Sequence, residues 1–288
     1  MLKNTFKQLV KFVLVVLFGL SFTTSAFAYG TITGNNTPET ASSMGYWKYY
    51  SPTTTILATD QNESYYTFTA YADEQVYVRS SYDNADVGMS LEVRDSNQNI
   101  IGNGDEVINP TSFTPFIFAS VNRVSNSNTF LIKVTRGNNI GNIYFTVSVY
   151  NRINTGNETF NFIGTSTNPG NPNYLANPDG VDSSIISMDL TNNSTVPIGA
   201  TVKSITTSSR LYPSLGGIIH KISPILTNVW YDSTIASATS GYYNISLSDE
   251  LPVAQQWDFR YNFKGASSSS MRNVKATINY EFDVTQQF

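Results

Sequence analysis

Any chemistry performed by this chain would have to rest on carboxylates, because imidazole and thiol groups are almost absent. The 288 residues contain one histidine, His220, and no cysteine. Zinc sites need imidazole or thiolate ligands, and a hydrolase nucleophile needs a strained turn such as Gly-x-Ser-x-Gly, which the sequence lacks. His220 lies in the apolar segment 217–222, a setting typical of a packed strand residue. Thiol nucleophiles are excluded, and zinc sites and serine triads are disfavoured.

Carboxylates could still cleave glycosides, since that reaction needs only two acids facing each other across a groove. The candidate acids all lie in expected turns or at strand ends: Asp105, Glu106, Asp249, Glu250 and Asp258. Solvated acids are ordinary at such positions. We therefore expect a protein that is not an enzyme, with carboxylate-based glycoside hydrolysis as an alternative.

Aromatic residues are better candidates for a binding site. Flat rings stack on the apolar faces of sugars while neighbouring polar groups bond the hydroxyls. Adjacent rings cannot all point into a core, although rings on alternating strand positions usually do. Exposed tyrosine and tryptophan also serve protein interfaces, which is a further alternative. The candidates are Tyr46, Trp47, Tyr49, Tyr50, Trp230, Tyr231 and Trp257.

Residues 1–28 have the pattern of a secretory signal peptide. Lys3, Lys7 and Lys11 precede an apolar run, and Ala26 and Ala28 form a small-residue cleavage site. We expect cleavage after Ala28, an extracellular protein that is at most non-covalently attached to the cell surface, and no membrane segment afterwards. Export without cysteine favours a Gram-positive bacterium over a eukaryotic route.

Charge patterning argues against nucleic acid as a partner. The chain carries 17 basic and 21 acidic residues, a net charge of −4, and charged residues make up only 13% of it. Its basic residues are scattered singly along the sequence, so no run could neutralise consecutive phosphates.

Alternation of apolar and polar residues predicts an all-β protein with two antiparallel, jelly-roll-like β-sandwich domains. Residues 143, 145, 147 and 149 are expected to share one buried face, as are the even-numbered residues from 274 to 284. Residues 29–152 form the first predicted domain and residues 158–288 the second, with a boundary near Thr155. A linker at residues 168–180 is the alternative. Expected strands span residues 65–71, 75–80, 90–95, 129–135, 143–150, 159–164, 184–190, 200–206, 217–222, 228–232, 242–247, 257–263 and 274–284.

The first half resembles the bacterial pre-peptidase C-terminal domains over residues 31–152. The resemblance rests on the order and spacing of Asn35–Ala41, Asn62–Phe68, Leu91–Asn97, Phe130–Val134 and Gly141–Val147. It implies a compact antiparallel sandwich of the kind appended to secreted enzymes, often peptidases, some members of which bind calcium or extracellular matrix. The second half resembles P-domain-like jelly rolls by analogy of fold only.

The resemblance also implies a calcium site just before the strand at residues 65–71. The family's acidic pair is replaced here by Asn62 and Ser64, with Asp60 and Glu63 nearby. Fewer carboxylates lower the affinity for calcium steeply. Asp60, Asn62 and Glu63 therefore form either a weak calcium site or a polar turn, and no other cofactor is expected.

These patterns together predict a secreted, non-enzymatic protein that binds an extracellular polymer, either a cell-wall or other glycan or a matrix protein. An accessory or processing role beside a separate secreted peptidase is the second hypothesis. It rests on the resemblance of the first domain alone.

Overall fold

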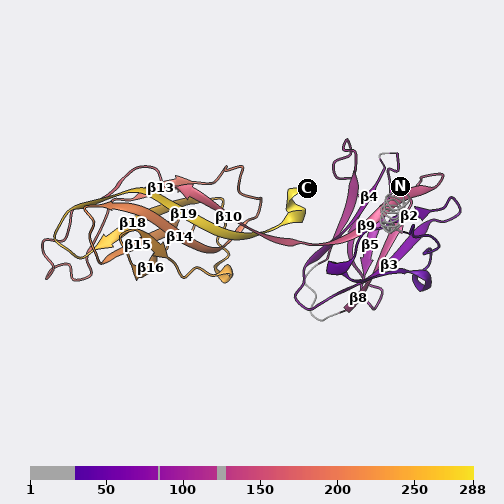
Figure 1. The fold of residues 1–288 in the computed structure, drawn as a ribbon, viewed down its shortest axis with the longest axis horizontal. Helices are drawn as coiled ribbons and strands as arrows, with labels where there is room; N and C mark the ends of the chain where they lie inside the picture. The colour runs from indigo at the N-terminus through magenta and orange to yellow at the C-terminus, as the bar shows by residue number, and fades with distance from the viewer. Residues whose placement is uncertain (1–29, 84, 122–127) are drawn as a thin grey trace, which may run out of the picture.

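The computed structural model describes residues 30–83, 85–121 and 128–288, so the predicted signal peptide lies outside the described residues. It confirms the all-β prediction: two β-sheet domains lie end to end along the long axis of the molecule (Figure 1). The helical segments of the described residues are four short 3₁₀ turns, at Pro38–Thr40, Trp47–Tyr49, Leu247–Asp249 and Val284–Gln287. Among these residues, no helix has the length and apolar character needed to span a membrane.

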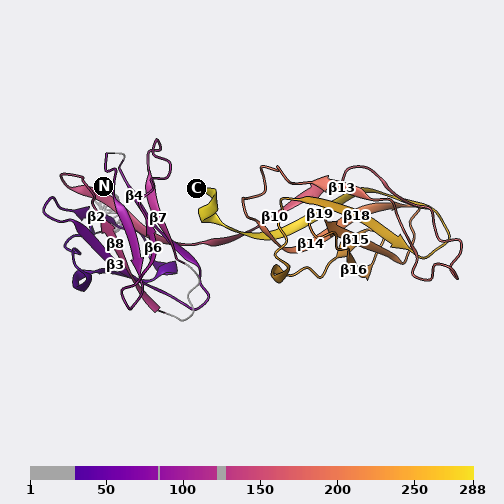
Figure 2. The ribbon, with the colours of Figure 1, turned by 180° about the vertical axis from the view of Figure 1, so that it is seen from behind.

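The first domain packs two sheets face to face. One sheet has the order β1 (Ser42–Tyr46), β3 (Glu63–Ala70), β8 (Asn128–Thr135), β5 (Ser90–Arg94) and β6 (Ile100–Gly104). The other has the order β2 (Thr54–Leu57), β9 (Ile143–Asn151), β4 (Val76–Tyr82) and β7 (Phe116–Val121). Strands β6 and β7 lie at the edge that Figure 2 brings into view. The pairing of β1 with β3 is parallel, whereas the other pairings are antiparallel.

Alternation in the sequence builds the core of this domain. Ile143, Phe145, Val147 and Val149 of β9 are all buried in one cluster, as their spacing predicted. Their partners across the sandwich include Phe68 of β3. The intervening residues of β9 face outward, because successive strand side chains point to opposite faces.

The second domain is also built on two sheets. One runs β10 (Ile153–Asn161), β19 (Ser269–Asp283), β14 (Thr201–Tyr212) and β17 (Ser240–Tyr242), with β11 (Ser166–Asn168) beside β19. The other runs β12 (Val181–Asp182), β18 (Gln256–Phe263), β15 (Ile218–Pro224) and β16 (Tyr231–Ala236), with β13 (Ile186–Asp189) beside β18. Val274, Ala276, Ile278 and Tyr280 of β19 lie in the core between these sheets, as alternation predicted.

Several segments differ from the sequence-based expectation, including strands β1, β2, β6 and β7, which were not expected. Residues 153–157, which we assigned to a polar stretch between domains, form the first half of β10 and pair with β19. Their polar side chains do not prevent this, because β10 is an edge strand and none of these five residues is buried. The strand expected at residues 242–247 ends at Tyr242, and a 3₁₀ turn follows at Leu247–Asp249.

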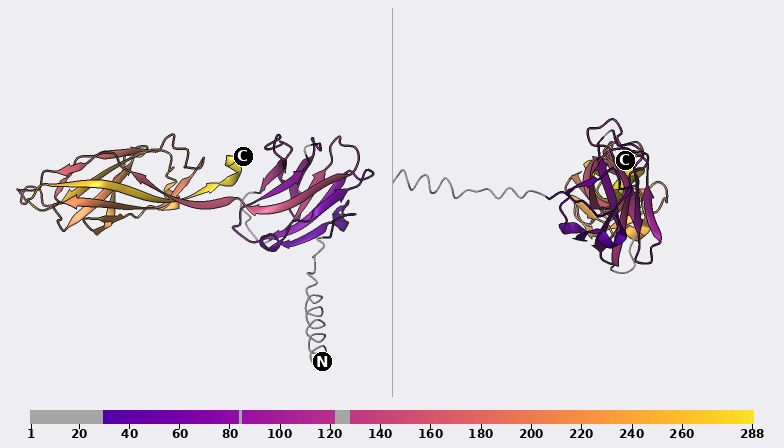
Figure 3. Two further views of the ribbon diagram at one scale, coloured as in Figure 1. Left: turned by 45° about the horizontal axis from the view of Figure 1, so that its top comes forward. Right: turned by 90° about the vertical axis from the view of Figure 1, so that its right-hand side faces the viewer.

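The domains meet where the chain passes from β9 through Arg152 into β10 (Figure 3). The Arg152 guanidinium pairs with Asp283 at 2.7 Å, and the Arg152 carbonyl accepts a hydrogen bond from the Val284 amide. The terminal Phe288 ring then packs edge-on against Phe116 and Phe118 of the first domain, at 5.2 and 5.1 Å between centroids.

Candidate functional site

The first group of predicted aromatic residues spans β1 and the 3₁₀ turn that follows it. Met44 anchors β1 in the core, and Gly45 takes a left-handed backbone with φ of 64°. The register with β3 shifts at this point, between Ser43 and Tyr46. Glycine adopts such a conformation without a steric penalty. The shift and the tight turn Trp47–Tyr49 send consecutive rings in different directions.

Glu74 organises these rings from the turn between β3 and β4. One carboxylate oxygen accepts hydrogen bonds from the Tyr46 hydroxyl at 2.5 Å and the Lys48 ammonium at 2.8 Å. The other accepts from the Trp47 indole N–H at 2.7 Å and the Tyr71 amide at 2.9 Å. Four donors thus converge on one carboxylate, which ties the turn at residues 71–74 to the segment at residues 46–48.

The resulting surface presents three tyrosine rings, which we call the tyrosine surface: Tyr46, Tyr49 and Tyr71. The Tyr46 ring lies between the other two, with centroid distances of 5.4 Å to Tyr49 and 4.6 Å to Tyr71. Tyr49 is 85% exposed and Tyr71 is 51% exposed. Lys48 adds a cation 5.5 Å from the centre of the Tyr46 ring. Rings fixed on their inner side and open to solvent can stack on an apolar ligand face.

Electrostatics keep Glu74 ionised. Burial raises its pKa, but the hydrogen bonds from Lys48, Tyr46, the Tyr71 amide and Trp47 outweigh that effect and hold the pKa at about 2. The bond to Glu74 raises the pKa of Tyr46 in turn. Glu74 therefore acts as a fixed acceptor and is a poor source of protons near neutral pH.

The structure brings together part of the predicted first group. Tyr46 and Tyr49 lie on the tyrosine surface, whereas Trp47 is largely buried and contributes through its N–H, and Tyr50 is half-buried against the core. Sequence reasoning missed Tyr71 and Glu74, which follow β3 by a few residues. The signal that could have found them is the turn-forming segment 71–74, which follows the end of β3 that pairs with Tyr46.

Of the aromatic residues predicted in the second half, Trp257 does not belong to a surface site. It lies on the inward face of β18, is fully buried, and donates its indole N–H to the Val253 carbonyl at 3.1 Å. Tyr231 is half-buried and packs against the same core. Trp230 is half-buried, with the Arg260 guanidinium over its ring at 4.0 Å.

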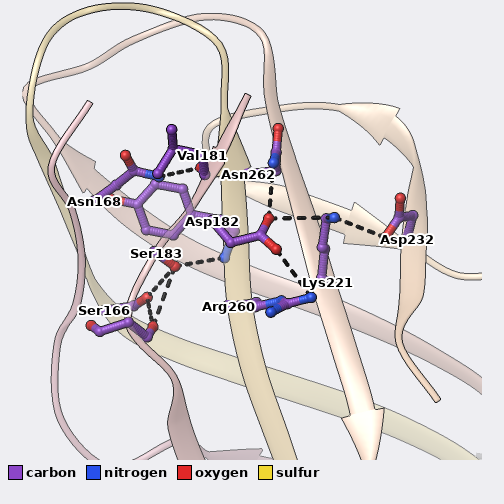
Figure 4. A network of polar contacts seen from close by, with 11 residues as sticks. Ser166, Asn168, Val181, Asp182, Ser183, Lys221, Asp232, Arg260 and Asn262 are labelled. Carbon is purple, nitrogen blue, oxygen red and sulfur yellow. Dashed lines mark hydrogen bonds and ion pairs between the residues drawn. The ribbon is translucent and has the colours of Figure 1, made fainter. Parts of the chain in front are cut away.

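Arg260 belongs to a polar network on the second domain (Figure 4). Asp182 is its centre, bonded to Arg260 at 3.0 Å, to Lys221 at 3.3 Å and to the Asn262 amide at 2.8 Å. Lys221 also pairs with Asp232 at 3.6 Å. These contacts join β12, β18, β15 and β16 side by side. Because every charge of the network faces an opposite charge, we assign it a structural role that also fixes Trp230.

Of the residues considered for calcium, Glu63 has other partners. Glu63 pairs with the Lys133 ammonium at 2.7 Å and accepts from the Tyr65 hydroxyl at 2.5 Å. Asp60 and Asn62 are exposed in the preceding turn. The described residues contain no group of three or more His, Cys, Asp and Glu side chains able to hold a metal ion. The engaged Glu63 carboxylate favours the polar-turn interpretation, and the calcium site stays a prediction.

His220 lies in the core of the second domain. Its Nδ1 is 3.0 Å from the Thr207 hydroxyl, which lies 2.9 Å from the Tyr243 hydroxyl. Burial lowers the pKa of His220 to about 4, so the imidazole is neutral at neutral pH. This fully buried group has no access to a substrate.

The comparisons with known proteins come from sequence and from structure. No protein-family model matches this chain. Among solved structures, a protein from Eubacterium rectale is similar over 86% of this chain and 81% of its own, with 10% identity and a TM-score of 0.37. The pre-peptidase C-terminal domain of a Bacillus anthracis collagenase is similar over its whole length and 40% of this chain, with 18% identity and a TM-score of 0.30.

That collagenase domain is from the family that the first half was predicted to resemble. The P-domain-like analogy for the second half stays a prediction. A much stronger similarity is to the uncharacterized protein YbdN of Bacillus subtilis (strain 168), which is 45% identical over 284 residues. The match covers 98% of this chain and 99% of that protein. The chain therefore belongs to the family of the Bacillus subtilis protein YbdN.

Proposed function

We propose that this chain is an exported, non-enzymatic protein that binds an extracellular polysaccharide through the tyrosine surface. The observation that carries the proposal is the pair of exposed rings, Tyr49 and Tyr71, held against Tyr46. Export is supported by the signal-peptide pattern of residues 1–28.

Preorganisation supports a binding role for these rings. Binding costs free energy when flexible side chains must be ordered, and a site that is already ordered avoids that cost. Glu74 holds the Tyr46 hydroxyl and the Tyr71 backbone by hydrogen bonds, so the Tyr46 ring that the other two rings contact is in place before a ligand arrives. The Lys48 ammonium lies beside the rings and has N–H donors beyond the one that Glu74 accepts, so it can bond sugar hydroxyls at the edge of the surface.

A non-enzymatic role is supported by how the candidate acids are used. Asp258 accepts hydrogen bonds from the Ser187 hydroxyl at 2.6 Å and the Gln256 amide at 3.0 Å. Asp249 caps its own 3₁₀ turn by accepting from the Ser246 amide. These two of the five candidate acids therefore have a structural role in the local fold.

Retention of the purified protein on insoluble polymers tests the proposal. We expect retention on at least one of peptidoglycan, chitin and cellulose, and a loss of retention for Tyr49→Ala and Tyr71→Ala. One stacked ring contributes about 1 kcal/mol, so each variant should bind about fivefold more weakly. Tyr144→Ala is the matched control, because Tyr144 is 52% exposed on the outer face of β9, in the same domain.

Passage through every glycan matrix without retention would refute the proposal. Retention on collagen alone would replace the glycan by a matrix protein as the ligand. Equal loss of binding by Tyr144→Ala and Tyr49→Ala would show that the tyrosine surface is not the specific binding site. Release of reducing sugar from a retained polymer would overturn the non-enzymatic assignment.

A further inference from the structure

A cluster of positive charge lies on the outer face of the second domain, away from the tyrosine surface. Arg210 of β14 lies directly opposite Arg272 of β19, and Lys275 follows three residues later, opposite Ser208. A bulge between these pairs, where Asn273 takes a left-handed backbone with φ of 51°, brings the three cations to one exposed region. We call this region the basic cleft.

Within the described residues, the positive charges of the basic cleft are not neutralised by ion pairs with acidic side chains. No acidic side chain forms an ion pair with Arg210, Arg272 or Lys275 there, although other cations of the domain are paired, as Lys203 is with Glu281 and Lys221 with Asp182. Like charges directly opposite each other on paired strands destabilise a sheet. Folding alone gives no reason to place two arginines opposite each other.

The cations line two adjoining clefts with volumes of about 670 and 530 Å³. Arg210 and Asn273 line both of them. Lys275, Asn161 and Ser208 line the larger one, and the smaller one adds Arg272 and Tyr212, whose ring is 78% exposed. Arginine fits carboxylate and phosphate groups in a bidentate manner, the amides and hydroxyl suit sugar hydroxyls, and the ring offers a stacking face.

Sequence patterning could not reveal this cluster. The residues Arg210 and Arg272 are far apart along the chain, so the basic residues look isolated in the sequence. The antiparallel pairing of β14 with β19 brings them together. The net charge of −4 makes the local excess of positive charge more distinctive.

We propose that the basic cleft binds an acidic polysaccharide, by its carboxylate or phosphate groups. Three cations are too few for a nucleic acid, since proteins that hold a duplex contact roughly 6 to 10 phosphates. The neutral polar groups and the exposed ring beside the cations match a polymer in which charged groups alternate with sugar faces. This proposal does not rest on the tyrosine surface.

Binding of labelled polymers to the full-length protein tests the inference. The probes are polygalacturonate, its neutral methyl ester, poly(glycerol phosphate) and a single-stranded DNA oligomer, each at low and high salt. We expect an anionic polymer to bind at low salt and to dissociate as salt screens the charges. The double variant Arg210→Gln/Arg272→Gln should bind roughly tenfold more weakly. Lys264→Gln is the control, because Lys264 is an exposed cation of the same domain outside the cleft.

Preference for polygalacturonate supports the proposal, whereas preference for poly(glycerol phosphate), which has no sugar ring, would overturn the assignment of a polysaccharide. Failure of both polymers to bind at low salt would overturn it, as would tighter binding of the DNA oligomer or of the neutral ester. A melting temperature that falls in the double variant would show that the arginines serve the fold. We expect it to stay constant or rise, because one repulsive pair is removed.

Discussion

Replacing Glu74 by glutamine probes the centre of the tyrosine surface with almost no change of volume. Each oxygen of the carboxylate accepts hydrogen bonds from two donors. Tyr46 and Lys48 donate to one oxygen, and Trp47 and the Tyr71 amide donate to the other. Glutamine keeps one accepting oxygen and presents an amide nitrogen in place of the second. Two of the four donors must therefore lose their acceptor, whichever way the amide is turned.

The cheaper orientation sets the expected loss. If the glutamine side-chain nitrogen faced Trp47 and the Tyr71 amide, the largely buried indole N–H would have no acceptor. We therefore expect this nitrogen to face Tyr46 and Lys48 instead. That orientation loses one hydrogen bond to a charged acceptor, worth about 1.5–3 kcal/mol, and an ion pair of a half-exposed lysine, worth at most about 1 kcal/mol. We expect a loss of about 2–3 kcal/mol, which lowers the melting temperature of the first domain by roughly 8 °C.

The loss should also depend on pH in a defined direction. The folded pKa of Glu74 is about 2, well below its ordinary value of 4.5. A carboxylate with a depressed pKa stabilises the fold fully above the unfolded pKa and loses that contribution as the pH falls toward the folded value. The difference between the wild type and Glu74→Gln should therefore be constant above about pH 5.5 and shrink between pH 4.5 and 2.

Differential scanning calorimetry of both proteins across this pH range is the assay. Glu158→Gln is the matched control, because it removes an exposed carboxylate from β10. Equal melting temperatures for the wild type and Glu74→Gln at pH 7 would refute the assigned role of the four donors. A difference that persists unchanged at pH 2.5 would refute the ionised state of Glu74.

Two further predictions concern the second domain and the contact between domains. Burial holds the pKa of His220 at about 4 against an ordinary 6.5, so stability should fall by up to about 3 kcal/mol as the pH drops from 6.5 to 4. The pH slope of the melting temperature should be shallower in His220→Gln, and an unchanged slope would show that other groups carry it. Phe288→Ala should remove about 1 kcal/mol of contact with Phe116 and Phe118 and broaden the interdomain distances measured by small-angle X-ray scattering. An identical scattering profile would show that Arg152 and Asp283 suffice to hold the domains.

Strands with strict alternation could be predicted from the sequence. β9 and β19 are examples, because burial on one face forces apolar residues onto every second position. Short strands with weaker alternation escaped, notably β1 and β2. In β1 the buried residue is Met44, flanked by small and polar residues, and its position follows from parallel pairing with β3. Pairing between strands that are distant in the sequence produces little pattern within the short segment itself.

The site was predictable in part for a related reason. Adjacent rings at residues 46–50 had to diverge, which located the tyrosine surface, but sequence alone could not decide which ring faces solvent. Trp47 points inward, where its indole N–H donates a hydrogen bond to Glu74. Trp257 was predicted as a binding residue but is fully buried. Alternation along β18 already places it on the inward face, and the packing of the opposite sheet shows that no part of the ring is exposed. Partners such as Tyr71 come from turns, whose positions depend on the fold.

Two groups with strongly shifted pKa values, Glu74 in the first domain and His220 in the second, bear on the choice between recognition and reaction. A general acid or base works best with a pKa near the working pH, so catalytic sites usually shift their groups toward neutrality. Glu74 is shifted away from it, to about 2, by donors that need its negative charge. His220 is shifted away from it, to about 4, by burial that excludes substrate as well as water. Both shifts favour a single protonation state at neutral pH, which makes proton transfer by either group unfavourable. In the case of Glu74, the fixed charge also suits a rigid binding surface.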